Sequence, residues 1–121
     1  MNERTTPREA PEVRRFEEAS AIECPCGVAR RLFARDDGGP VGIHRVRISQ
    51  DSQRHYHKHT TEYYIVLEGS GEIELNDERV AIKPGDVVYI PPYTRHVARG
   101  DLEIINVVCP PFDPADEYLE E

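Results

Sequence analysis

The sequence contains no tryptophan, only five leucines and only three cysteines among its 121 residues. Valine and isoleucine together number 20, and these β-branched residues favour pleated strands over helices. The composition therefore disfavours a helical bundle. The cysteines, Cys24, Cys26 and Cys109, are too few for a complete disulfide framework, which is typical of a reducing compartment.

Long hydrophobic runs are also missing from the sequence. No apolar segment approaches the roughly 20 residues that a membrane span needs, and the first eleven residues lack the apolar core of a signal peptide. We therefore expect a cytoplasmic protein with no membrane partner.

Basic stretches of the kind that bind nucleic acids are absent as well. The chain carries 15 Lys and Arg against 23 Asp and Glu, a formal charge of −8, and residues 101–121 contain seven acids and no base. This balance argues against a nucleic-acid partner and predicts a solvated acidic end.

The length of the chain suits one domain and is too short for two independent cores. We expect a flexible N-terminal arm over residues 1–20, a β-domain over 21–109 and an acidic C-terminal tail over 110–121. Hydrophobic residues make up only 38% of the chain, so part of the surface is expected to be covered in a homodimer.

From residue 28 onward the sequence consists of short runs rich in Val, Ile and Tyr, divided by turn signals such as Lys83-Pro84-Gly85-Asp86. Many short strands at this spacing predict an all-β sandwich or barrel. The expected strands are 28–34, 42–49, 54–57, 62–68, 71–75, 79–82, 86–90, 96–99 and 103–108.

The first candidate site lies between residues 55 and 62. On a strand, His55 and His57 point to the same side, whereas Glu62 needs a bend, placed at residues 60–61, to join them. Two imidazoles and a carboxylate are ligands of a metal site with open positions. A solvent-exposed histidine-rich hairpin is the other interpretation, and His59 is an alternative ligand.

Two spaced motifs resemble those of the cupin superfamily. The first motif, H-x-H-x4-E-x6-G, is matched in full, and the second, G-x5-P-x-G-x2-H-x3-N, is matched at its first glycine, its proline and its histidine. Tyr93 stands at the inner glycine of the second motif and Gly100 at its final asparagine. The matching positions are His55, His57, Glu62, Gly69, Gly85, Pro91 and His96.

The resemblance implies a double-stranded antiparallel β-barrel of the jelly-roll type, with short irregular arms at both ends. It also implies a metal inside the barrel, held by His55, His57, Glu62 and His96. This ligand set suits Mn, Fe, Co, Ni, Cu or Zn and does not choose among them. Tyr93 is expected to alter the mouth of the pocket.

Other polar residues have two interpretations each. If Glu62 faces inward, so do Tyr64, Val66 and Glu68; Tyr64 is then a hydrogen-bond donor to a substrate or an ordinary core tyrosine. His44 either reaches the pocket or, as we expect, is partly exposed.

The remaining candidates are expected to be structural. Arg45, Arg47 and Arg95 bind an anionic substrate or, by default, are surface charges. The Cys24-Pro25-Cys26 segment is expected to form a turn with two small buried thiols.

The predicted function is that of a metal-binding cupin with a small polar or carbonyl-bearing molecule as its ligand. The first class is a small metalloenzyme, an oxygenase, isomerase or lyase, with Tyr64 assisting. The alternative is a non-catalytic module that binds a sugar or effector. A homodimer is expected to cover Tyr63, Ile65 and Leu67 on the outer face of their strand.

Overall fold

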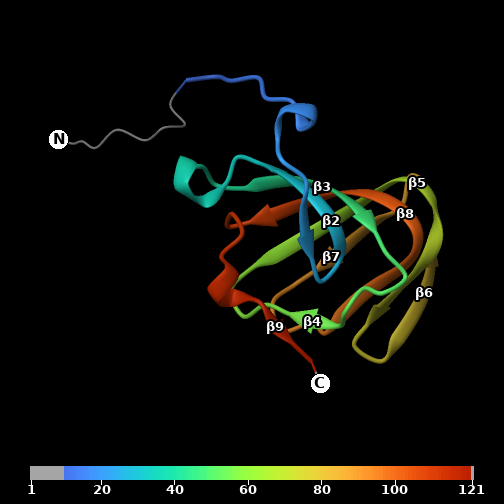
Figure 1. Ribbon diagram of the computed structural model, residues 1–121. Coiled ribbons are helices and arrows are strands. Elements are labelled where there is room, and N and C mark those ends of the chain that lie inside the picture. The colour runs from blue at the N-terminus through green and yellow to red at the C-terminus, as the bar shows by residue number, and fades with distance from the viewer. Residues whose placement is uncertain (1–9, 121) are drawn as a thin grey trace.

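The computed structural model describes residues 10–120, and in them it shows the predicted all-β antiparallel barrel (Figure 1). Residues 1–9 of the expected N-terminal arm and residue 121 of the tail lie outside the described residues. The strands are β1 (Ile22–Cys24), β2 (Gly27–Leu32), β3 (Gly42–Ile48), β4 (His55–Tyr56), β5 (Thr61–Leu75), β6 (Glu78–Ile82), β7 (Val87–Ile90), β8 (His96–Cys109) and β9 (Tyr118–Leu119).

Three short 3-10 helices accompany the strands: η1 (Phe16–Glu18), η2 (Arg35–Asp37) and η3 (Pro114–Asp116). No helix within residues 10–120 is long and apolar enough to cross a membrane.

All strand pairs of the sheet are antiparallel, in the order β1-β2-β3-β8-β4-β9, and β5 pairs with β6, β7 and β8. The two long strands β5 and β8 lie side by side and curl together across the molecule (Figure 1). Their curvature closes the sheet around an interior into which β2, β3 and β4 also face.

The strands β5 and β8 run on where the sequence predicted breaks near residues 69–70 and 100–102. Gly71 and Gly100 are register partners there, and a Cβ on Gly100 would lie 2.7 Å from the Gly71 Cα. The glycines therefore permit a close crossing of the two backbones instead of ending the strands.

An irregularity in the β5–β8 register falls between Val66 and Glu68. Such a bulge shifts the alternation of inward and outward side chains. Tyr64 and Val66 are buried as predicted, but Glu68 is exposed, so the expectation that it faces the interior is wrong.

Two rows of inward side chains cross β2, β3, β8 and β5. The first row is apolar and buried, and consists of Ala29, Val46, Ile104 and Val66. Burial of each of the larger side chains in this row contributes about 1.5–3 kcal/mol to the free energy of unfolding. The second row, two residues away on every strand, consists of Arg31, His44, Asn106 and Tyr64, and so places polar groups beside the core.

The C-terminal segment folds onto the barrel. β9 pairs with β4, and the side chain of Asp116 in η3 is buried. Tyr118 stacks on Tyr56, with ring centroids 5.2 Å apart. The sequence indicated a solvated acidic end, but a large part of this segment is packed against the strand that carries His55 (Figure 1).

Cys24 and Cys26 are joined by a disulfide, which corrects the expectation of two buried thiols. They flank the turn between β1 and β2, which brings their Cα atoms to 5.2 Å, a separation that a disulfide spans. Cys109 is a free, exposed cysteine.

Tyr93 adopts a left-handed backbone conformation, with a φ of 72°, in the loop between β7 and β8. Its N–H donates to the His57 carbonyl oxygen at 2.6 Å, so this conformation joins the loop to the histidine segment. The backbone that favours glycine is thus kept although the residue is a tyrosine.

Replacing Tyr93 with glycine is expected to stabilise the protein by about 0.5–1 kcal/mol. The left-handed region costs a non-glycine residue roughly 1–2 kcal/mol, and the greater freedom of glycine in the unfolded chain takes back part of the gain. The ring is 57% exposed, so its loss costs little. Urea unfolding measures the change, and Tyr93→Ala, which keeps the Cβ, should show no gain; equal stability of both variants would contradict the account.

Candidate metal centre

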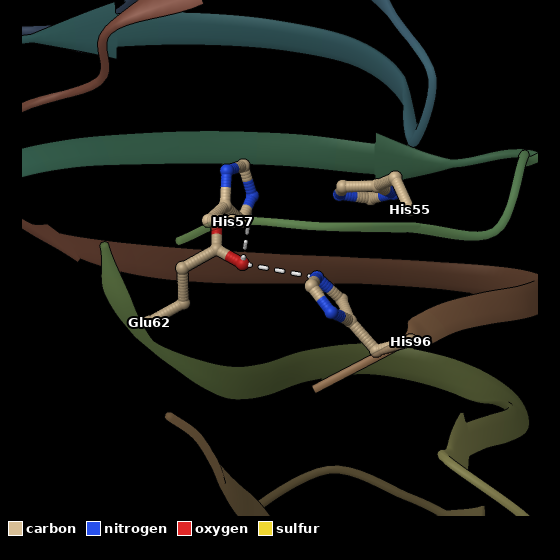
Figure 2. Close-up of side chains that lie close together, drawn as sticks. All are labelled: His55, His57, Glu62 and His96. Atoms are coloured by element: carbon tan, nitrogen blue, oxygen red, sulfur yellow. Dashed lines mark ion pairs between the residues drawn. The ribbon is translucent and has the colours of Figure 1, made fainter. Parts of the chain in front are cut away.

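Three histidines and one glutamate meet inside the barrel (Figure 2). His55 opens β4 and is the register partner of His96, which opens β8; His57 follows β4, and Glu62 is the second residue of β5. One ligand atom from each of the four lies within 4.8 Å of the others, and all four residues are buried. The structure thus brings together the four residues that the sequence singled out.

Each imidazole is oriented by a backbone carbonyl. The Nδ1 atom of His55 lies 2.9 Å from the Gln53 oxygen, and that of His96 lies 2.8 Å from the Thr94 oxygen. The Nδ1 atom of His57 lies 2.9 Å from the Asp116 oxygen. Because a carbonyl only accepts, Nδ1 carries the proton in all three rings, and in the neutral ring Nε2 is left with a lone pair.

The carboxylate of Glu62 is held from both sides. Its Oε2 accepts from Asn106 Nδ2 at 2.8 Å, and its Oε1 lies 3.1 Å from His96 Nε2 and 3.6 Å from His57 Nε2 (Figure 2). Burial would raise the pKa of Glu62, but the contacts with His96, His57 and Asn106 hold it below its ordinary value. Glu62 is therefore an anion in the interior.

The electrostatics of His55 favour its neutral form. Burial, together with the neighbouring His96, lowers the pKa of His55 to about 4. The buried atoms Glu62 Oε1, His57 Nε2 and His96 Nε2 have no aligned hydrogen-bond partner among the described residues. A carboxylate oxygen facing imidazole lone pairs is stabilised by a cation between them, and this donor set suits a divalent transition metal.

Asp116 fixes the bend that lets Glu62 join the histidines. Its carboxylate accepts from the N–H groups of Lys58 and His59, at 2.9 and 3.0 Å, and from the Thr60 hydroxyl at 3.0 Å. The bend lies at residues 58–59, slightly earlier than predicted, and leaves the side chain of His59 exposed and outside the cluster.

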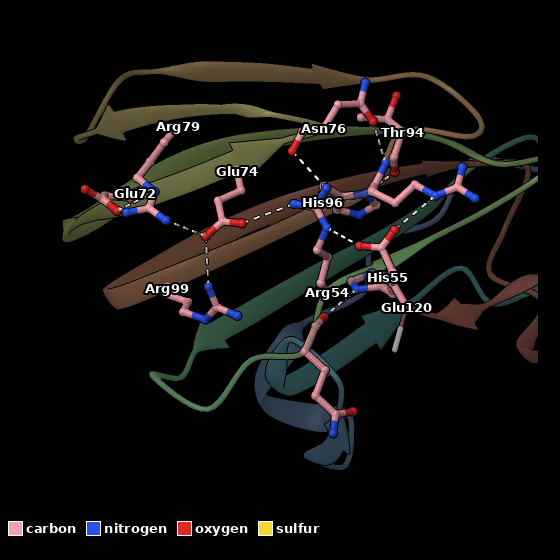
Figure 3. Close-up of polar contacts among 12 residues, drawn as sticks. Arg54, His55, Glu72, Glu74, Asn76, Arg79, Thr94, His96, Arg99 and Glu120 are labelled. Carbon is pink, nitrogen blue, oxygen red and sulfur yellow. Dashed lines mark hydrogen bonds and ion pairs between the residues drawn. The ribbon is translucent and has the colours of Figure 1, made fainter.

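A network of ion pairs next to His55 and His96 ties the C-terminal segment to β5 (Figure 3). Glu74 binds Arg54 at 3.1 Å and Arg99 at 3.0 Å. Arg54 also binds Glu120, which lies 3.4 Å from Arg95. Arg54 and Arg95 are next to His55 and His96 in the sequence, so the network holds the two segments that carry these ligands.

The cluster opens into a small inner cavity of about 20 Å³, which has room for roughly one water molecule. His55, His57 and Glu62 line it, and the rest of its wall consists of Cys24, Cys26, Ala29, Arg31, His44, Val46, Tyr64, Asn106, Phe112 and Glu117. A larger cavity of about 410 Å³ shares Arg31, His44 and Phe112 with it. These three side chains therefore stand between the cluster and the wider space.

The other candidate residues fall into two groups. Tyr64 is buried in the cavity wall, and so is His44, which is 5% exposed; the expectation that His44 is partly exposed is wrong, because its side chain points into the barrel, in register with Arg31 and Asn106. Arg45, Arg47 and Arg95 lie outside that wall, and their charges meet the carboxylates of Glu103, Asp101 and Glu120.

Sequence reasoning missed Asn106, Asp116, Arg31 and Glu117 in this site. A single amide within the apolar run Ile104-Ile105-Asn106-Val107-Val108 is a signal that could have found Asn106. Arg31 shares the inward parity of Ala29 on β2. Asp116 and Glu117 gave no local signal, because their role depends on where the C-terminal segment docks.

The chain is similar in sequence and in fold to known proteins. The family model described as Cupin domain matches residues 42–107, more than half of the chain. A protein of known structure from Planctomyces limnophilus is 39% identical and covers 91% of this chain and 97% of its own, with a TM-score of 0.87.

Two further proteins are similar to this chain. L-ectoine synthase from Halomonas elongata is 34% identical over 82 residues, 65% of this chain and 59% of the synthase. The chain spans less than two thirds of the length of the curated relatives that it matches. The nucleoside dehydratase Pac13 from Streptomyces has the same fold, with a TM-score of 0.79 and 22% identity over 93% of this chain and 92% of Pac13.

Acidification is expected to destabilise the metal-free protein between pH 6.5 and 4, and His44 to account for part of the loss. Burial, with the charge of Arg31, lowers the pKa of His44 from 6.5 to about 4 against the opposing effect of Glu62. Between these values the unfolded chain binds a proton that the folded chain does not, so the free energy of unfolding falls as the pH falls, by up to roughly 1.4 kcal/mol per pH unit for each such histidine.

Urea unfolding at several pH values, in the presence of a chelator, measures this slope. His44→Gln should flatten it by close to one proton, while His59→Gln, which changes an exposed histidine, should leave it unchanged. Identical slopes in wild type and His44→Gln would show that His44 titrates normally in the folded state.

Proposed function

Because this chain belongs to the cupin domain family, we propose that it is a metalloprotein whose ion is held by His55, His57, Glu62 and His96. One observation carries the proposal: the Nε2 atoms of His57 and His96 and the Oε1 atom of Glu62 meet, buried and without aligned partners among the described residues. The carbonyls that bind the Nδ1 atoms supply the supporting shell that metal-bound histidines need.

Within this proposal the protein is a small metalloenzyme, an oxygenase, isomerase or lyase, that acts on a small polar or carbonyl-bearing molecule. Such an ion supplies Lewis-acid polarisation of a carbonyl or redox chemistry when bound. Four protein ligands leave room for a bidentate oxygen donor on a six-coordinate ion, and the donor set admits Fe, Mn, Zn, Ni, Co or Cu.

Proton-carrying residues of the wall favour an isomerase or a lyase among these classes. Burial raises the pKa of Tyr64 well above its ordinary value, so its hydroxyl keeps its proton and donates it in a hydrogen bond to a substrate oxygen. Burial also raises the pKa of Glu117 in the same wall, which suits a residue that takes up and returns a proton. Both reaction classes need proton transfer.

The second candidate function is a non-catalytic module that binds a small molecule such as a sugar or effector. The small size of the inner cavity supports it, because a substrate has little space around the cluster. Conversion of a bound molecule over time, followed by NMR, separates the two candidates: an enzyme consumes the molecule, whereas a module returns it unchanged.

Natively expressed protein is expected to contain a transition metal in stoichiometric amount, and the His57→Ala/His96→Ala double variant close to none. The double variant removes the two Nε2 atoms that face Glu62 Oε1 and that would bind the metal. Elemental analysis of both proteins measures the difference. His59→Ala, which removes an exposed histidine two residues from His57, is the matched control and should retain its metal; equal metal in wild type and double variant would reject the site.

We also propose a homodimer formed through the outer face of β5 and β7. Tyr63 and Tyr89 lie 5.3 Å apart on this face, and together with Leu67 and Val87 they are exposed. An apolar sheet face of this kind is typical of a contact between subunits.

Light scattering is expected to give a dimer mass for wild type and a monomer mass for Tyr89→Glu, because a charge in an apolar interface is not compensated. Tyr93→Glu is the matched control: Tyr93 is equally exposed, at 57% against 56% for Tyr89, but lies in the loop before β8. A monomer mass for wild type would show that this face stays open to solvent.

A further inference from the structure

Two buried polar atoms in the cavity wall are left without partners, apart from those of the metal cluster. The Nε–H of Arg31 is a donor and the Oδ1 of Asn106 is an acceptor, and neither has a hydrogen-bond partner among residues 10–120. Leaving such a group unpaired in the interior of a protein costs free energy. A ligand that supplies an acceptor to Arg31 and a donor to Asn106 would recover this cost.

Arg31 and Asn106 belong to one polar row across the sheet. Arg31 pairs in register with His44, His44 with Asn106, and Asn106 with Tyr64, on strands β2, β3, β8 and β5. Residues in register on neighbouring antiparallel strands face the same side. All four line the inner cavity, so the row forms one wall beside the metal cluster.

The guanidinium of Arg31 lies over an aromatic ring. Its central carbon lies 4.3 Å from the centroid of the Phe112 ring, and the His44 ring meets Phe112 edge-on at 6.3 Å. An arginine placed over an aromatic ring can still donate from the N–H groups at the edge of its guanidinium. These three side chains stand at the boundary between the inner cavity and the cavity of about 410 Å³.

Arg31 differs from the other arginines near the site in its place in the cavity wall and in its charge partners. It is the only arginine or lysine in the described wall of the inner cavity. Arg35 lines the larger cavity, but its charge is met by Asp113 at 2.8 Å. Glu117 lies in the same wall and attracts Arg31 through its charge, but no ion pair between the two is found among the described residues.

We propose that the substrate of this site is a small hydroxycarboxylic acid, with its carboxylate bound by the Arg31 guanidinium and its hydroxyl donating to Asn106 Oδ1. The planar fork of an arginine matches the two oxygens of a carboxylate. The bulk of the molecule occupies the larger cavity, and only its hydroxyl, a group about the size of one water molecule, enters the inner one. This inference rests on the proposed function, since it names the ligand of the same metal site.

Isothermal titration with glycolate, lactate and 3-hydroxybutyrate, each compared with its neutral amide, tests the proposal on metal-loaded protein and on chelated protein. We expect at least one of the acids to bind about tenfold or more tightly than its amide, because a charge-assisted hydrogen bond is lost in the amide. Arg31→Gln should remove this preference in both preparations. Arg31→Lys, which keeps the charge without the fork, should keep part of it.

Arg47→Gln is the matched control, since Arg47 lies outside both cavities and its charge is met by Asp101; this variant should bind like wild type. Circular dichroism checks that each variant folds, and elemental analysis checks its metal. Equal binding of acid and amide, or unchanged binding in Arg31→Gln, overturns the proposal even if the metal is present. Absence of metal from wild type, with Arg31-dependent binding retained, instead overturns the metal proposal alone.

Discussion

The negative charge of Glu62 is buried inside the barrel, and the buried polar side chains of the interior are arranged around it. An ionised carboxylate taken out of water costs several kcal/mol unless hydrogen bonds or opposite charge compensate it. Asn106 binds one oxygen, and the rings of His57 and His96 face the other. Those rings are in turn fixed by backbone carbonyls. The buried charge and these carbonyls together orient Glu62 on β5, His96 on β8 and His57 just after β4.

The sequence was sufficient for the fold and for the identity of the four residues that meet. The alternation of His55 and His57 on a strand and the spacing to Glu62 are local properties, and His96 follows from a motif with a rigid proline loop before it. The ends of the strands were harder to predict from the sequence. Gly71 and Gly100 look like turn signals in the sequence, but in the sheet they are positions where two backbones approach closely.

The supporting residues could not be found in this way, for a physical reason. Asn106 is 44 residues from Glu62, and Asp116 is 59 residues from His57, so each contact exists only once β5, β8 and the C-terminal segment have taken their places. Glu68 was misplaced because one bulge reverses the alternation on which its assignment depended. His44 was misjudged because its burial comes from the inward face of β3, which is closed off only when the barrel has formed.

The dependence of the histidine segment on Asp116 has a consequence for synthesis of the protein. Ribosomes make the chain from its N-terminus, so the bend at residues 58–59 emerges long before the carboxylate that holds it. A nascent chain that has not reached Asp116 lacks both this anchor and the carbonyl that orients His57. The complete set of contacts around the cluster therefore cannot form before Asp116 has been translated.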